Sequence, residues 1–201
     1  MINIGGIDYT LYRDYDRGNF GRLDLNGKVA YMRARVDIAL VQPCKVALTV
    51  ADKVHVGLIV ATTVCAGISA ASTFQHGQQA PGGQDRAYFT AFVRDYMHPC
   101  LQGPLVDPTE RRVASWVDWM YYRLRNGLAH AFAIEFGGLD RVQNAYVVGA
   151  GGRFGEPIMD LPTLVDDFDA GWNRMLDQVL QNPVSQLATD FVRRFQQVFA
   201  D

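Results

Sequence analysis

The feature that most constrains the fold is the stretch 54–75, which contains no Asp, Glu, Lys or Arg. Its length is about what a membrane-spanning helix needs. However, Ala, Thr, Ser and Gly dominate the stretch rather than Leu, Ile or Phe, and His55 stands near its start. A transmembrane helix is therefore the less favoured alternative. The sequence predicts a helix buried inside a bundle, with small residues that let a neighbouring helix approach closely.

Helical patterns occur on both sides of this stretch. Val29, Met32, Val36 and Leu40 repeat at spacings of three and four, which places them on one helix face. Pro43 removes a backbone donor and predicts a break there. Cap signals and periodicity predict further helices along the chain. The expected helix starts are Lys28, Cys44, Asp85, Asp107, about Leu161, and Asn182.

The remaining segments are rich in glycine or mixed in pattern. Glycines and mixed polarity over residues 1–27 predict an irregular N-terminal arm, with a short extended piece at Ile7–Leu11. The composition of 76–84 predicts a loop. Two β-like pieces flank the glycine-rich run 149–155, which predicts a small β-hairpin near 143–160. This run does not fit a dinucleotide-binding turn, because its third glycine comes one residue late for GxGxxG and no helix follows. We expect a mostly α fold: one domain over 1–201, a bundle of about five to six helices with that hairpin inserted.

Composition argues against several classes of protein. The formal net charge is −2 and the pI is near 6.1, so no overall basic field indicates a nucleic-acid binder. Cys44, Cys65 and Cys100 form no CxxC pair, which favours reduced thiols in a cytosolic protein. The N-terminus has no signal-peptide pattern. The four histidines lack metal-ligand spacing. We therefore expect a cytoplasmic protein with no metal, no cofactor and no membrane association.

One polar constellation lies in an otherwise apolar, aromatic helical segment: Arg125, Asn126 and His130. Asn126 and His130 are four residues apart and share a face of an ideal helix, whereas Arg125 points about 140° away from His130. This set suits the chemistry of a phosphodiester. A histidine can move a proton at neutral pH, an arginine can hold phosphate oxygens, and an asparagine can orient either partner. No metal is required if the RNA 2′-hydroxyl is the attacking group.

The run Tyr122-Arg123-Leu124-Arg125-Asn126-Gly127-Leu128-Ala129-His130 resembles the signature of HEPN domains (higher eukaryotes and prokaryotes nucleotide-binding). Their hallmark is an arginine, commonly followed by a polar residue, and a histidine after four to six intervening residues. The resemblance implies a HEPN-like helical bundle and a metal-independent endoribonuclease, often of toxin or phage-defence type. It implies Arg125, Asn126 and His130 as catalytic residues at a composite site across a homodimer. An antitoxin or another partner protein would fit such a system.

Two alternatives stand beside the nuclease. The first is a non-catalytic HEPN-like bundle that binds a nucleotide, RNA or a partner protein. In the second, the motif only packs: Arg125 pairs with Asp118 or Glu135, while His130 is a satisfied core residue. Elsewhere, Arg111–Arg112 and Arg193–Arg194 predict solvated faces, although the first pair could line a groove leading to the motif.

Overall fold

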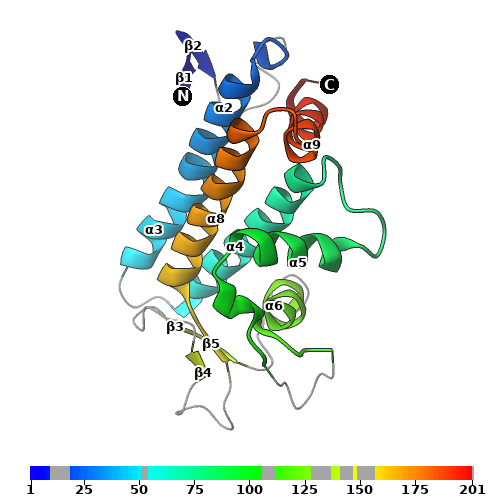
Figure 1. Cartoon of the computed structure of the whole chain (residues 1–201). Helices are drawn as coiled ribbons and strands as arrows, with labels where there is room; N and C mark the ends of the chain where they lie inside the picture. The colour runs from blue at the N-terminus through cyan, green and yellow to red at the C-terminus, as the bar shows by residue number, and fades with distance from the viewer. Residues whose placement is uncertain are drawn as a thin grey trace.

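The computed structural model describes residues 1–9, 19–50, 54–105, 112–127, 137–140, 147–148 and 157–200. This part of the chain is mostly helical, which confirms the predicted class (Figure 1). The helices are α2 (Leu25–Val36), η1 (Asp37–Val41), α3 (Gln42–Thr49), α4 (Val54–Gln75), α5 (Asp85–Tyr96), η2 (Pro99–Gln102), α6 (Trp116–Trp119), η3 (Met120–Arg125), α8 (Leu161–Gln181), α9 (Gln186–Phe195) and η4 (Gln196–Ala200). The strands are β1 (Ile2–Ile4), β2 (Ile7–Tyr9), β3 (Gly138–Asp140), β4 (Val147–Val148) and β5 (Pro157–Asp160).

The uncharged helix α4 lies in the middle of the bundle, in contact with α3, α5, α8, α9 and η3 (Figure 1). One side of α4 is buried, including Val60, Val64 and Ile68, whereas Ile59 is 62% exposed. By length and composition alone, Val56–Gln75 would also qualify as a membrane span, with 44% of that window buried in the protein. The predicted bundle helix is thus present, and only one of its faces is covered.

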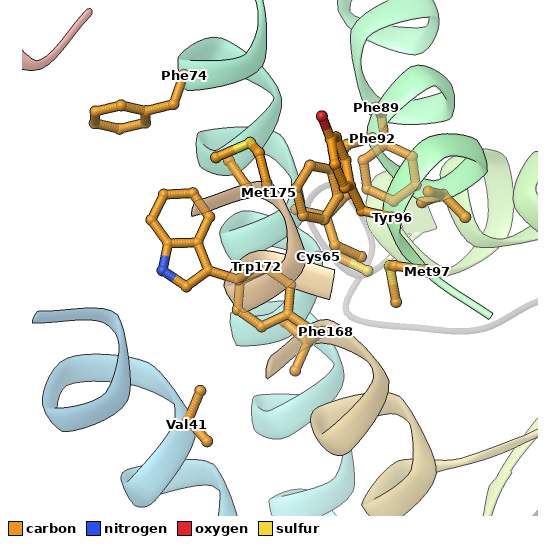
Figure 2. Packing of buried hydrophobic residues seen from close by; sticks show 14 of the residues in the cluster. Val41, Cys65, Phe74, Phe89, Phe92, Tyr96, Met97, Phe168, Trp172 and Met175 are labelled. Carbon is orange, nitrogen blue, oxygen red and sulfur yellow. The ribbon is translucent and has the colours of Figure 1, made fainter. Parts of the chain in front are cut away.

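Aromatic side chains join the helices. Trp172 of α8 meets Phe74 of α4 edge-on, with ring centroids 5.9 Å apart, and Phe168 lies 6.2 Å from Phe92 of α5 (Figure 2). A second group, Phe20, Tyr31, Phe195 and Phe199, joins α2 to α9 and η4. Edge-to-face pairs of this kind add to the apolar burial. These contacts hold α2, α4, α8 and α9 together around one core.

The first long helix differs from its predicted course at both ends. It begins at Leu25 rather than Lys28, because the Asp24 side chain accepts the Gly27 amide at 2.7 Å and caps it. No break occurs at Pro43. The π-type turn η1 ends at Val41, and Pro43 stands in the first turn of α3, the position at which a helix tolerates proline, so the helical course continues to Thr49. The expected helix from Cys44 into the uncharged stretch is instead two helices, α3 and α4.

The N-terminal arm is more regular than predicted. β1 and β2 form an antiparallel hairpin in which Ile2 pairs with Tyr9. Gly5 and Gly6 have positive φ values and form its turn. Tyr9 is buried against Phe20, with ring centroids 5.2 Å apart. The expected short extended piece is present as β2, whereas the irregular course expected for the rest of 1–9 is wrong, because an aromatic anchor fixes these residues to the bundle.

Two predicted helix starts are also corrected. Asp107 lies outside the described residues, and the helix that reaches Arg125 begins at Trp116, where Ser115 accepts the amide of Asp118. The last helix begins at Gln186, where Ser185 accepts the Ala188 amide, not at Asn182. In each case a serine beside the apolar run provides the cap. The start near Leu161 is confirmed, with Asp160 as its cap.

A small sheet closes the end of the bundle away from the two termini (Figure 1). β4 and β5 pair antiparallel, Val147 with Ile158 and Val148 with Pro157, which confirms the predicted hairpin. β3 adds a parallel strand on the other side of β5, which the sequence did not predict. The glycine-rich run 149–155 lies outside the described residues.

Candidate functional site

The helical segment that carries Arg125 consists of α6 and η3, Trp116–Arg125, and we call it the motif helix. Asp118 holds its start in place. Its carboxylate accepts Arg86 at 2.6 Å, the Ser115 hydroxyl at 2.9 Å and the Ala114 amide at 3.2 Å. Partial burial opposes ionisation of this carboxyl, but the hydrogen bonds from Arg86, Ser115 and Ala114 outweigh it and lower the Asp118 pKa. The alternative in which Arg125 pairs with Asp118 is therefore wrong, because Arg86 takes that position.

Arg125 stands at the end of η3 and is held by two neighbours. Its Nη1 donates to Asn126 Oδ1 at 2.9 Å, and its guanidinium carbon lies 5.1 Å from the centre of the Tyr121 ring. The π-type turn 120–125 ends at Arg125, and Asn126 and Gly127 continue as helix. His130 lies outside the described residues, as does Glu135. The structure thus brings Arg125 and Asn126 together, and the position of His130 relative to them remains a prediction.

Arg125 lines a cavity of about 650 Å³. One wall is the partly exposed face of α4; the others are α2 with η1, the loop after α4 with the start of α5, and α9 with η4. The charged residues among the described lining are Arg35, Asp85, Arg125 and Arg194. Three guanidinium groups from three separate helices therefore face one cavity, with a single carboxylate at its rim.

Close packing of α4 shapes this cavity. A Cβ on Gly67 would lie 2.5 Å from Leu40 Cδ1 and 2.9 Å from Phe168 Cζ. Those distances are below van der Waals contact, so glycine is what lets α4 approach η1 and α8 here. Around it, Ala66, Ser69 and Ala70 add small side chains to the wall. Small residues on α4 leave room for a ligand where larger ones would fill the space.

Arg194 and Arg35 are each held at the cavity. Arg194 Nε donates to Thr73 Oγ1 at 3.1 Å and its Nη1 donates to Gln197 Oε1 at 3.2 Å. Burial lowers the Arg194 pKa. Arg35 Nη1 donates to the Tyr31 hydroxyl at 3.0 Å, and its guanidinium lies 5.2 Å from the centre of the Phe199 ring. Both guanidiniums are positioned before any ligand binds.

Ion pairs distinguish other surface arginines from Arg125 and Arg194. Arg33, Arg86, Arg94 and Arg193 each lie within 3.0 Å of an aspartate oxygen. Over the residues that the structure describes, neither Arg125 nor Arg194 has a carboxylate within ion-pair distance. A half-buried arginine without a counter-charge favours binding of an anion.

Sequence reasoning missed Arg194 by grouping it with Arg193 on a solvated face. Arg193 does fit that prediction, since it is 48% exposed and pairs with Asp190 at 3.0 Å. Arg194 turns toward the cavity. Its position between Phe191 and Phe195, both fully buried, is the signal that could have placed it at the edge of the apolar face.

The Cys65 thiol is close to the motif but chemically inert. Burial raises its pKa to about 12, an effect that the positive charge of Arg125 partly offsets. A nucleophilic cysteine needs a lowered pKa.

Comparisons of the chain with protein-family models, with curated proteins and with solved structures found no match. The function must therefore be argued from the site itself.

Proposed function

We propose that this protein binds a phosphate-bearing ligand, RNA or a nucleotide, in the cavity that Arg125 lines. The observation that carries the proposal is the state of Arg125: it faces a cavity of about 650 Å³ and has no carboxylate partner among the described residues. A volume of this order is typical of small-molecule sites, about 300–1,000 Å³. The planar guanidinium suits two oxygens of one phosphate.

The neighbours of Arg125 support this role. Tyr121 lies under the guanidinium and Asn126 fixes one nitrogen, so little side-chain freedom is lost when a ligand binds. A hydrogen bond to a charged group contributes about 1.5–3 kcal/mol. Removal of Arg125 should therefore weaken binding by at least about tenfold.

Equilibrium binding of a fluorescent single-stranded RNA tetranucleotide in EDTA tests the proposal. The tetranucleotide carries 2′-O-methyl groups, so that it cannot be cleaved through its 2′-hydroxyls. Arg125→Ala should lose most of the affinity. Arg33→Ala is the matched control, because Arg33 pairs with Asp177 at 2.6 Å and does not line the cavity. Wild-type protein that binds neither this tetranucleotide nor AMP, or equal affinities for the two variants, would contradict the proposal.

The second candidate goes further: metal-independent RNA cleavage in a HEPN-like homodimer. The hydrogen bond between Arg125 and Asn126 favours it, because it joins two of the three motif residues beside the cavity. In this hypothesis His130 is the general acid or base, Arg125 stabilises the phosphorane-like state, and Asn126 positions Arg125. The non-catalytic alternative retains binding without cleavage.

Cleavage of unmodified single-stranded RNA in EDTA separates the two candidates. A nuclease loses activity on His130→Ala while still binding the 2′-O-methyl tetranucleotide. A non-catalytic binder leaves unmodified RNA intact with wild-type protein. Asn126→Ala is informative as well: under the nuclease hypothesis it lowers kcat more than it raises KM, since its role is to position Arg125.

A further inference from the structure

Arg125 and Arg194 lie at different points along the same face of α4. The α4 residues that line the cavity run from Thr63 to Phe74, about 16 Å at 1.5 Å per residue. Arg194 is fixed beside Thr73 by its hydrogen bond. Arg125 belongs to η3, which packs on α4, and it lines the same cavity.

The Arg194 guanidinium is held rigidly and lacks a counter-charge. The Thr73 hydroxyl that accepts its Nε itself donates to the Ala70 carbonyl at 2.7 Å, so the acceptor is fixed. The nearest acid along α9, Asp190, pairs with Arg193. Among the described residues, Arg194 Nη2 has no hydrogen-bond partner. An unneutralised guanidinium at a cavity wall is an anion-binding group.

We propose that Arg194, assisted by Arg35, is a second anion-binding position in this cavity, so that the ligand carries two phosphates spaced along α4. The proposal rests on the proposed function at Arg125 and adds the substrate class. The α4 wall of the cavity is about 16 Å long, so it can hold more than one phosphate of a strand. A single-stranded oligonucleotide of several residues can therefore reach both arginines, and a mononucleotide reaches one.

The rest of the lining fits a strand placed this way. Asp85 is exposed at the rim and repels phosphate, which keeps the backbone on the side of the arginines. Phe74 and Tyr88 also line the cavity, but both rings are buried, with Phe74 packed on Trp172 and Tyr88 on His76. The arginines are therefore the groups through which this cavity would hold a strand.

The test compares two probes, the 2′-O-methyl RNA tetranucleotide and AMP, on four proteins: wild type, Arg125→Ala, Arg194→Gln and Arg193→Gln. Arg193→Gln is the matched control, because it removes the same charge from the adjacent position outside the cavity lining. Arg194→Gln keeps a donor for Thr73, and an unchanged thermal midpoint shows that the fold is intact. A variant with a lowered midpoint is replaced by Arg194→Lys, for which a partial loss of affinity is expected.

We expect Arg194→Gln to weaken tetranucleotide binding about tenfold or more and to leave AMP affinity unchanged. It should also reduce the slope of log K against log salt by about 0.7, the value for one phosphate contact on a single strand. If tetranucleotide binding depends on Arg125 but Arg194→Gln matches Arg193→Gln, the second position is wrong and the proposed function stands. If neither probe binds the wild-type protein, both proposals fail.

Discussion

The guanidinium of Arg86, in the first turn of α5, lies 2.6 Å from the carboxylate of Asp118 in α6. The Asp118 side chain is only 10% exposed and also accepts the Ser115 hydroxyl. This contact ties the start of the motif helix to α5, whose first residues line the cavity. Through this contact, the position of Arg125 depends on Arg86, which lies in a different part of the sequence.

Asp118→Asn should therefore destabilise the protein. The change keeps the shape of the side chain but removes the negative charge that accepts hydrogen bonds from Arg86, the Ser115 hydroxyl and the Ala114 amide. We expect the free energy of unfolding at neutral pH to fall by about 1–3 kcal/mol. Urea unfolding followed by circular dichroism measures it. Asp177→Asn, which breaks an exposed pair with Arg33, is the control, with a loss below about 1 kcal/mol.

The loss of stability caused by Asp118→Asn should depend on pH. Because the folded pKa of Asp118 is lowered, its contribution is fully present above the ordinary aspartate pKa of about 3.9 and disappears as pH falls through the folded value. The stability difference between wild type and Asp118→Asn should thus shrink in acid. A difference that is absent at neutral pH, or that grows in acid, would show that the pair does not stabilise the fold.

His76 should make the stability of the protein depend on pH near the ordinary histidine pKa of about 6.5. It lies after α4, its ring 4.0 Å from that of Tyr88, and its Nε2 is buried without a hydrogen-bond partner among the described residues. Burial lowers its pKa, against the opposing charges of Asp190 and Asp95, and the charge of Arg94 lowers it further. The unfolded chain therefore binds a proton more readily than the folded protein, and stability falls as pH drops below about 6.5.

His76→Phe should remove this dependence while keeping a ring against Tyr88. The measurement is the urea midpoint of both proteins at neutral pH and at about one unit below the ordinary histidine pKa of about 6.5. Wild type should lose stability over that interval relative to the variant. Parallel pH profiles for the two proteins would mean that His76 titrates normally in the folded state.

The three cysteines should differ in reactivity. Burial raises the pKa of Cys44 and of Cys100 and takes that of Cys65 to about 12, but only Cys100 is exposed, whereas Cys44 and Cys65 are buried. Because the thiolate is the reactive form, iodoacetamide should label Cys100 in the native protein, and Cys44 and Cys65 only after unfolding. Peptide mass spectrometry identifies the labelled sites. Early labelling of Cys65 would indicate that the core around Arg125 opens readily.

Local patterns predicted much of this fold because they report on local physics. The uncharged run became a bundle helix, and Asp160 with Pro162 starts α8 where expected. Each of these features depends on a few consecutive residues.

Most of the failures have nonlocal causes. Pro43 is a local exception: it stays in a helical course because it stands in the first turn of α3, after the π-type turn η1. β3 pairs in parallel with β5 across a long connection. Arg194 is a cavity residue only because α9 packs beside Thr73 of α4. The cavity is made by residues from five parts of the chain, so the motif at 125–130 revealed one contributor and not the other two arginines.

The predicted homodimer allows a direct test of the composite site. If each site combines motif residues from two chains, a mixed dimer of Arg125→Ala and His130→Ala still contains one arginine and one histidine from different chains. Mixing the two inactive proteins should therefore restore RNA cleavage in EDTA. Random exchange makes about half of the dimers mixed, and each mixed dimer keeps one of its two Arg125–His130 pairings, so activity should reach about a quarter of wild type.

Subunit exchange has to be measured alongside, by the appearance of mixed dimers between two protein samples of different mass. Exchange without recovered cleavage means that each chain needs its own Arg125 and His130, and the two-fold site is then wrong. Wild-type protein that sediments as a monomer while cleaving RNA leads to the same conclusion. Recovery in the mixture, and none with two copies of the same variant, would place Arg125 of one chain beside His130 of its partner. That arrangement removes the objection that these residues point about 140° apart on one ideal helix.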